Sequence, residues 1–531
     1  MKIHNYIISA VFVLSSFLSS CSDWLEVEPL NTRSINYFYT TPSEMEQALM
    51  GVYNGLLPMS EYYWFMSELR SDNAWCGGGS SVQRDYIEIS IFNKNIYQLS
   101  TLNDAWLDLY EIVSRANIFL SKVDGVEITV EGVKEQQIAE ARFLRAFAYF
   151  DLVRYWGRVP LSLTPLTINE AMKLGQSEAL EVYEKAIIPD LEYAIAHLTD
   201  APVDYLGKPA AAGRVTLQAA QAMLGRVYLT MAGYPLYDKA KEELAKGLFE
   251  EVIDYADAKK KFWAKDAEEW KKIWISDNDN KYHIFEIQYV AAANYGNPMV
   301  YWTSPSVSTD YISISMSGNG SVCAGPLDLF FKEEKNEKGE YLDVRCLATI
   351  DTIKVFPNGK KYSGEDFFVK FFEHKIKRAK LGYGDIDGQI VDRGYFPINF
   401  PLIRLEDVML MYAEIVGPTE RGIEMVNRIR KRATGKELTE EEKEPVAFQQ
   451  CVGDERRKEF AGEGIRWHDL VRHHDMQPIK DKFYYYAERY GSDPQILSYA
   501  DRVKEGTHVY PIPDPQMKVS EGLYQQNEAY R

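Results

Sequence analysis

The clearest helical pattern in the chain runs from Ala139 to Leu161, AEARFLRAFAYFDLVRYWGRVPL. Apolar residues recur there every three or four positions and form two separate faces. One face carries Phe143, Ala146, Phe147, Phe150 and Val153, and the other carries Leu144, Ala148, Leu152 and Tyr155. A helix that is apolar on two faces packs between other helices. Arg142, Arg145 and Arg154 on this helix therefore need hydrogen-bond acceptors or water nearby. Gly157 and Pro160 are expected to end it.

Helical patterns also occupy much of the remaining chain. Thr41-Pro42-Ser43-Glu44 predicts a helix start with the threonine as N-cap. Apolar periodicity predicts further helices from Asn103, after Pro165, over Arg404 to Val416 and over Glu420 to Arg432. The pattern therefore predicts a mostly α protein.

Two of these segments resemble a helical hairpin repeat. Leu224 to Tyr228 fits the L-G-x-x-Y element of a tetratricopeptide helix, and Ala245 to Phe249 fits the A-x-x-x-F element of its partner. The second element arrives about eight residues later than a strict repeat allows, and Gly233-Tyr234-Pro235 accounts for the difference as an inserted turn. We expect degenerate hairpins that bury their faces only by stacking on neighbours.

The helical pattern breaks in two places. From Ser67 to Tyr97 it gives way to polar residues, with a glycine-rich run over Gly77 to Ser81 that predicts a flexible loop. His283 to Tyr289 alternates like a strand and leads into a long polar and aromatic loop that ends near Gly320. A long loop inside a compact domain is usually functional, and residues 340–400 mix short strands and turns.

Several motifs, in order along the chain, resemble those of one family. They are Ala48-Leu49-Met50-Gly51-Val52-Tyr53, the W-x-x-x-Y…N pattern of Trp106, Tyr110 and Asn117, the helix at Ala139, the segment Glu455 to Arg472 (ERRKEFAGEGIRWHDLVR) and Tyr510-Pro511-Ile512-Pro513. Together they resemble the SusD/RagB family, outer-membrane lipoproteins of Bacteroidetes that capture nutrients for a partner TonB-dependent transporter. The C-terminal Gln526-Asn527-Glu528-Ala529-Tyr530 departs from the family's usual Q-N-P-G-Y.

The resemblance implies one large SusD-like domain. It is mostly α, built on tetratricopeptide-like helical hairpins with long loops and a few short strands. We assign residues 1–20 to a lipoprotein signal peptide and 21–531 to this domain, with an N-terminal region over 21–225 and a C-terminal region over 275–531.

The N-terminus is typical of a targeting segment. Lys2 supplies a positive charge, and Ile7 to Leu18 is apolar but too short to span a bilayer. Leu18-Ser19-Ser20-Cys21 resembles a lipobox, which implies lipidation of Cys21 and a lipid anchor in the outer membrane. Cleavage as an ordinary signal peptide is the alternative. The acidic residues after the cysteine resemble an export signal to the extracellular side.

Composition adds two points. The net charge of −18, with no basic run longer than Lys259-Lys260-Lys261, argues against a nucleic-acid partner. The 36 tyrosines suit a wet binding surface, where the ring packs and the hydroxyl forms hydrogen bonds. Four cysteines remain after Cys21, and the sequence does not decide whether they pair.

No catalytic, cofactor or metal motif is recognised. The chain has no H-E-x-x-H, G-x-S-x-G or P-loop. Asp277-Asn278-Asp279 begins like a calcium loop but has Tyr282 and Gln288 where glycine and glutamate belong. Glu459 and Glu463 are expected on one helix face beside arginines, which predicts a structural ion-pair network rather than a glycosidase pair. His468, His473 and His474 are expected in scaffold or surface roles.

Two loops combine aromatic rings with side chains that bond hydroxyl pairs, as sugar binding requires. The candidate ligand-binding residues are Arg70, Asp72, Asn73 and Trp75 in the first loop and Tyr295, Asn297, Tyr301 and Trp302 in the second. Trp75 and Trp302 are the strongest of the eight, because glycine and polar residues surround them. For each aromatic residue alone, packing is an equally good explanation.

The function implied is a non-catalytic surface lipoprotein that captures an oligosaccharide and delivers it to a SusC-like TonB-dependent transporter. Three alternatives stay open. They are a peptide-binding, RagB-like uptake component, a surface glycoside hydrolase, and a protein–protein adaptor built on the helical repeats.

Overall fold

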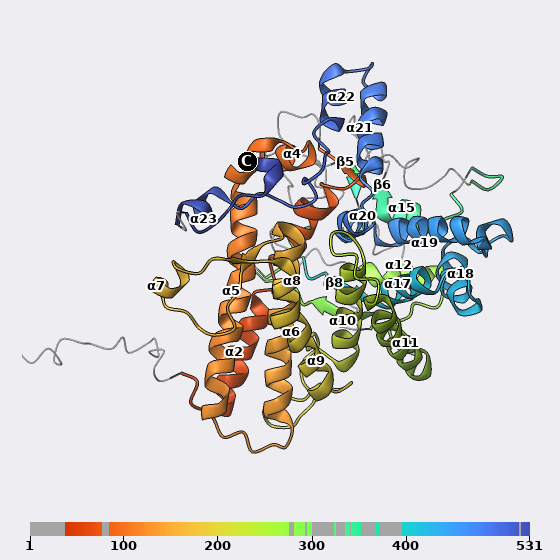
Figure 1. Cartoon of the computed structure of the whole chain (residues 1–531). Coiled ribbons are helices and arrows are strands. Elements are labelled where there is room, and N and C mark those ends of the chain that lie inside the picture. The colour runs from red at the N-terminus through yellow and green to blue at the C-terminus, as the bar shows by residue number, and fades with distance from the viewer. Residues whose placement is uncertain are drawn as a thin grey trace, which may run out of the picture.

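A computed structural model of the chain describes residues 38–76, 84–275, 281–292, 295–299, 323–324, 335–339, 341–351, 367–368, 370–371, 396–519 and 522–531. The described part is mostly α-helical, as the sequence predicts. In the first half, four helices lie side by side (Figure 1). They are α2 (Pro42–Asn54), α5 (Ser100–Lys122), α6 (Val133–Trp156) and α9 (Ile188–His197).

Helix α6 is the helix predicted from the two-faced apolar pattern. It packs against α5 and α9, and 19 of its 24 residues are buried. It ends at Gly157, whose φ of 73° is easily adopted only by glycine. Its buried arginine Arg145 makes a bidentate ion pair with Asp190 on α9, at 2.8 and 2.9 Å. The prediction of a sandwiched helix with paired arginines is confirmed.

Helix α2 begins where the N-cap pattern predicts. The Thr41 hydroxyl accepts from the backbone N–H of Glu44, and the Glu44 carboxylate accepts from the backbone N–H of Thr41 in return. Such a capping box satisfies amide groups that the first turn would otherwise leave without partners.

Helices α10 (Leu217–Ala232) and α11 (Lys241–Lys259) form the predicted tetratricopeptide-like hairpin. Gly225 on α10 lies against the ring of Phe249 on α11, and an added Cβ would lie 2.4 Å from that ring. Helices α17 (Leu405–Val416) and α18 (Glu420–Thr434) continue the stack, because α17 packs on both α11 and α18. Figure 1 shows these helices beside one another, to the right of the α5–α6 layer.

Short two-stranded antiparallel sheets connect distant parts of the chain. The predicted strand is β4 (His283–Ile287), and it pairs with β8 (Phe400–Arg404) directly before α17. The other described pairs are β1 (Ala74–Trp75) with β5 (Cys323–Ala324), β2 (Val159–Pro160) with β3 (Gln176–Ser177), and β6 (Ile350–Asp351) with β7 (Phe367–Phe368).

The remaining elements are mostly short. They are α3 (Met59–Tyr62), η2 (Tyr63–Glu68), α4 (Arg84–Ser90), η3 (Lys94–Gln98), η4 (Val123–Gly125), α7 (Ile168–Ala171), α8 (Ala179–Val182), η5 (Tyr183–Ile187), α12 (Ala267–Lys271), η6 (Lys272–Trp274), α15 (Arg345–Thr349), η7 (Glu441–Lys443), α19 (Pro445–Phe460), α20 (Arg466–Arg472), α21 (Gln477–Arg489), α22 (Pro494–Ala500), α23 (Asp514–Val519) and η8 (Glu528–Tyr530). Helix α4 lies inside the segment where the sequence predicts only a break. One large apolar core extends from Val52 on α2 to Ile512 near the C-terminus.

Among the described residues, none of the helices has the length and apolar character needed to cross a bilayer.

Candidate functional site

The β1–β5 pair joins the first candidate segment to Cys323 and Ala324, which follow the second predicted loop in the sequence. Trp75 is opposite Cys323 and Ala74 is opposite Ala324, in antiparallel register. In an antiparallel pair, the end of one strand lies beside the start of the other. The chain therefore leaves β1 after Trp75 at the same end of the pair where it enters β5 at Cys323. The fold thus anchors side by side two segments that are far apart in the sequence.

Arg70 lies just before β1 and is fully buried. Its guanidinium group donates to the carbonyl of Ile89 at 3.0 Å and to the hydroxyl of Tyr530 at 2.9 Å. The same group stacks over the ring of Phe92, with 3.6 Å from Cζ to the ring centroid. These contacts tie the start of the loop to α4 and to the C-terminus.

Asp72 and Asn73 are also buried, and both bind arginines. Arg466 donates to the two carboxylate oxygens of Asp72 at 2.8 and 3.0 Å, and Arg457 adds an ion pair at 3.0 Å. Burial by itself raises the pKa of Asp72, but Arg457 and Arg466 outweigh it and hold the pKa well below its ordinary value. Asn73 donates to Glu68 at 2.8 Å and accepts from Arg457 at 3.0 Å.

Trp75 packs inside an aromatic cluster formed with α21 and α22. Its side chain is 2% exposed and stacks on Tyr486, with ring centroids 4.5 Å apart and planes 16° apart. Tyr486 in turn stacks on Tyr490 at 6.2 Å, and Tyr490 is 45% exposed. The stack therefore begins in the core at Trp75 and reaches the surface at Tyr490.

Arg70, Asp72, Asn73 and Trp75, all predicted to contact ligand, are buried among protein partners in the described structure. The polar segment carries charged groups because it crosses the core between α4 and α19, where arginines and carboxylates satisfy one another. The glycine-rich run that made Trp75 look exposed begins two residues after it, at Gly77. In this structure the four side chains build the scaffold beneath the surface.

In the second candidate loop, one predicted residue is buried, one is exposed and two are not described. Asn297 is fully buried and donates to the carbonyl of Ile398 at 2.8 Å, so it attaches the loop to the segment before β8. Tyr295 is 50% exposed, and its backbone forms a turn with Val290 and Ala292. Tyr301, Trp302 and the predicted lipidation site Cys21 lie outside the described residues.

Sequence reasoning missed the contribution of α21. Its run Phe483 to Tyr486, followed by Tyr490, supplies the rings around Trp75, and Tyr484 is also exposed. Four aromatic residues in a row within a helix place rings on several faces at once, and this signal was available. The same helix buries Lys482, which donates to the carbonyls of Ser71 at 2.5 Å and Ala74 at 3.1 Å.

Lys482 has an unusual electrostatic environment. Burial lowers the pKa of its ammonium group to about 7, with Asp72 opposing the shift and Arg70 and Arg457 adding to it. The ammonium group lies directly under β1, at the base of the Trp75 stack. The protonated ammonium group is therefore held by the backbone carbonyls of Ser71 and Ala74.

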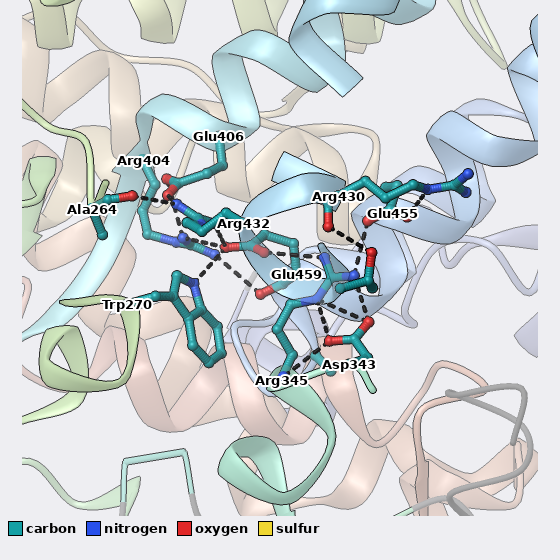
Figure 2. Close-up of polar contacts among 12 residues, drawn as sticks. Ala264, Trp270, Asp343, Arg345, Arg404, Glu406, Arg430, Arg432, Glu455 and Glu459 are labelled. Atoms are coloured by element: carbon teal, nitrogen blue, oxygen red, sulfur yellow. Dashed lines mark hydrogen bonds and ion pairs between the residues drawn. The ribbon is translucent and has the colours of Figure 1, made fainter. Parts of the chain in front are cut away.

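The acidic cluster near the C-terminus forms a buried ion-pair network (Figure 2). Glu459 on α19 is fully buried and accepts from Arg404 at 3.0 Å, from Arg432 at 2.8 Å and from Arg345 at 3.2 Å. The indole N–H of Trp270 adds a fourth hydrogen bond at 2.8 Å. Figure 2 shows these side chains converging on Glu459 from four separate segments.

Glu463 is not on the same helix face as Glu459, contrary to the sequence prediction. Helix α19 ends at Phe460, and Glu463 lies in the following turn between Gly462 and Gly464, which have φ values of 86° and 72°. The two carboxylates nevertheless meet the same partner, because Arg404 binds Glu463 at 2.9 Å through two nitrogens.

The network holds the Glu459 carboxylate ionised. Burial raises the pKa of Glu459, but Arg432, Arg404 and Arg345 outweigh it and hold the pKa well below its ordinary value. A general acid needs a pKa near the working pH, and a carboxylate with four fixed donors does not have one. The prediction of a structural ion-pair network is confirmed.

The three nearby histidines have separate surroundings. Burial lowers the pKa of His468 well below its ordinary value, and Arg154 and Arg226 add to the effect. His473 lies 3.4 Å from Glu414, and His474 lies 3.1 Å from Glu505. Within the described part of the chain, no three histidine, cysteine, aspartate or glutamate residues are grouped to hold a metal ion.

Comparison with known proteins shows what the chain is similar to. A family model described as "SusD family" matches residues 376–530, and one described as "Starch-binding associating with outer membrane" matches residues 23–229. A SusD-like protein of Formosa agariphila is 24% identical over 516 residues, covering 89% of this chain and 90% of that protein.

Solved structures share the fold over almost the whole chain. A SusD homolog from Bacteroides thetaiotaomicron has a TM-score of 0.73 at 23% identity, covering 93% of this chain and 99% of the other. A structure described as a laminarin binding SusD-like protein has a TM-score of 0.67 at 24% identity, covering 93% of this chain and 100% of the other. The two family models match separate parts of the chain, and the similarity in fold extends over both. The chain belongs to the SusD/RagB family.

Proposed function

We propose that this protein is a glycan-binding lipoprotein of the bacterial cell surface. It captures an oligosaccharide without cleaving it and delivers it to a SusC-like TonB-dependent transporter, while acyl chains on Cys21 hold it at the outer membrane. Family membership supports this proposal, and so does the similarity in fold to a laminarin binding SusD-like protein.

One structural observation carries the proposal. The β1–β5 pair joins the first candidate segment to residues that follow the second predicted loop, and the ring stack that begins at Trp75 reaches the surface at Tyr490. A sugar ring offers C–H groups to an aromatic face and hydroxyls to polar side chains, so exposed rings next to polar loops suit it. We therefore assign ligand contact to Tyr295, Tyr301, Trp302 and Tyr490, and we assign the buried residues of the first loop to support.

Affinity electrophoresis and calorimetry with a panel of glucans, including laminarin, test glycan binding. Trp302→Ala and Tyr490→Ala are expected to weaken binding about tenfold or more, since stacking on one ring contributes about 1 kcal/mol beyond the buried area. Tyr237→Ala is the matched control, because Tyr237 is 54% exposed on the α10–α11 connection and is expected to leave affinity unchanged. Equal affinity of all three variants and the native protein would contradict the assignment.

The alternatives make different predictions. A peptide-binding relative would bind a peptide pool and ignore every glycan of the panel. A hydrolase would release reducing ends from the polysaccharides, whereas we expect none. The carboxylates nearest to a glycosidase pair, Glu459 and Glu463, are engaged by arginines within the ion-pair network.

Anchoring and delivery need experiments in cells. Cys21→Ala is expected to release the protein from the membrane fraction, and metabolic labelling with an alkyne fatty acid tests lipidation directly. Co-purification with a TonB-dependent transporter from detergent extracts tests the partner. Recovery of the native protein without any such transporter would contradict that part of the proposal.

A further inference from the structure

A second candidate site is a cavity apart from the β1–β5 pair. It lies where the C-terminal end of α6 meets α8, the α10–α11 connection and α20, and is called the second cavity below. Its volume is about 350 Å³, which is within the usual range for small-molecule sites. Much of its wall is aliphatic or aromatic, and several of these side chains are only partly buried: Ala179, Leu180, Leu236, Val471 and Val509. Leu180 stands at the rim with 43% of its surface exposed.

The inner end of this cavity is polar. Arg154, Thr230, His468 and Arg472 separate it from a smaller cavity of about 40 Å³. Nε of Arg154 and Nε2 of His468 are both buried, and neither has a hydrogen-bond partner among the described residues. A buried polar atom without a partner costs about 1–3 kcal/mol, so a bound acceptor at this place would be stabilised.

The cavity is also rich in positive charge. Among the described residues that line it, Arg154, Arg158 and Arg472 are opposed by a single carboxylate, Glu178, which is exposed. Arg472 is neutralised by Glu414 and Asp469, and Arg154 is neutralised by Asp151. Arg158 is different, because the hydrogen-bond partner found for its side chain in the described structure is the neutral amide oxygen of Gln525, at 3.3 Å.

We propose that this cavity binds a small amphipathic carboxylic acid, with its ring or chain against the aliphatic wall and its carboxylate toward Arg154, Arg158 and His468. Two observations together select this class: the aliphatic walls suit a ring or chain, and the polar lining has buried nitrogens on Arg154 and His468 without hydrogen-bond partners, with Arg158 free of ion pairs among the described residues. Burial lowers the pKa of His468, and Arg154 and Arg226 add to the effect, so the imidazole at the cavity is neutral and can donate a hydrogen bond through Nε2. The site is independent of the proposed glycan site.

The test uses 3-phenylpropanoate as the probe and 3-phenylpropan-1-ol as its uncharged counterpart, with binding measured by calorimetry and ligand-observed NMR. The acid is expected to bind saturably in the millimolar range or tighter, and about tenfold more tightly than the alcohol. Arg158→Gln is expected to reduce this preference, because it removes charge without breaking an ion pair.

A matched pair of variants locates the site. Leu180→Trp fills the mouth and is expected to weaken binding of the acid more than about tenfold. Leu163→Trp is its control, since Leu163 is 38% exposed between β2 and α7 but does not line the cavity. Val509→Phe also fills space in the cavity. It replaces Leu180→Trp as the test variant if Leu180→Trp melts at a lower temperature than the control.

Three results would overturn the proposal. They are no saturable binding of the acid up to about 10 mM, equal affinity for acid and alcohol, or undiminished binding in both Leu180→Trp and Val509→Phe. Glycan affinity measured on the same variants is expected to stay unchanged, so failure here is distinguishable from failure of the proposed glycan site.

Discussion

Two arginine-rich regions of this molecule differ in whether their charged and polar groups have partners. Around Glu459, the arginines from β8, α15 and α18 each contact one or more buried carboxylates. Around the second cavity, Arg158 meets only an amide oxygen within the described structure, and two buried nitrogens have no partner there. The first region is closed and holds distant segments together, whereas the second has polar groups unsatisfied beside open space. A cluster of charged residues in the sequence therefore does not mark a ligand site by itself.

The largest effect is expected in the closed region. Glu459→Gln removes the charge that three arginines share, so Arg345, Arg404 and Arg432 lose part of their compensation inside the core. We expect the free energy of unfolding to fall by about 3–5 kcal/mol, measured by urea denaturation. Glu437→Gln is the control, because its ion pair with Lys431 is exposed and is worth less than about 1 kcal/mol. Similar losses in both variants would contradict the distinction between buried and exposed pairs.

The ring stack at β1 tests the same contrast for aromatic residues. Trp75→Ala opens a cavity in the core and is expected to lower the free energy of unfolding by about 3 kcal/mol or more. Tyr490→Ala truncates the exposed end of the same stack and is expected to change it by less than about 1 kcal/mol. Thermal and urea unfolding of the two variants measure this. If Tyr490→Ala proves as destabilising as Trp75→Ala, the stack does not end at a solvent-facing platform.

Lys482 is expected to make stability depend on pH. Its pKa is about 7 in the folded chain and near 10.4 when unfolded. Between these values the unfolded chain binds more protons, so stability rises with pH, by up to about 1.4 kcal/mol per pH unit. Urea unfolding between pH 7 and 9 measures the slope, below the range where tyrosines titrate.

Lys482→Met should remove this slope, because methionine has similar length and no charge to bury. Lys480→Met on the same helix is the control, since Lys480 is only half-buried and shows no such contacts with β1. An unchanged slope in Lys482→Met would show that another group titrates in this range.

The smallest effect on stability is expected at the open region. Arg158→Gln breaks no ion pair found in the described structure, so the free energy of unfolding should change by less than about 0.5 kcal/mol. Arg432→Gln, which loses contacts to Glu406 and Glu459, should cost several times more. Urea denaturation of the two variants side by side measures the difference. Equal losses of free energy of unfolding would contradict the difference between the two regions from which the second site was inferred.

Local patterns in the sequence determined much of the architecture. Periodicity placed α6, α17 and α18, the N-cap pattern at Thr41 placed the start of α2, and the hairpin motif predicted the pairing of α10 with α11. These features depend on spacing along a single helix or between two neighbours, so a linear reading contains them. Family membership also followed from motifs read in order.

Burial of the candidate site was decided only by the tertiary structure. Arg70, Asp72, Asn73 and Trp75 have the composition of a binding loop, but their partners come from α19, α20, α21 and the C-terminus, several hundred residues away. Whether a polar or aromatic side chain meets solvent or a buried partner depends on such distant segments, and local sequence carries no record of them. For the same physical reason, only the folded chain shows that β1 pairs with β5 and that a cavity with unsatisfied polar nitrogens lies at the end of α6.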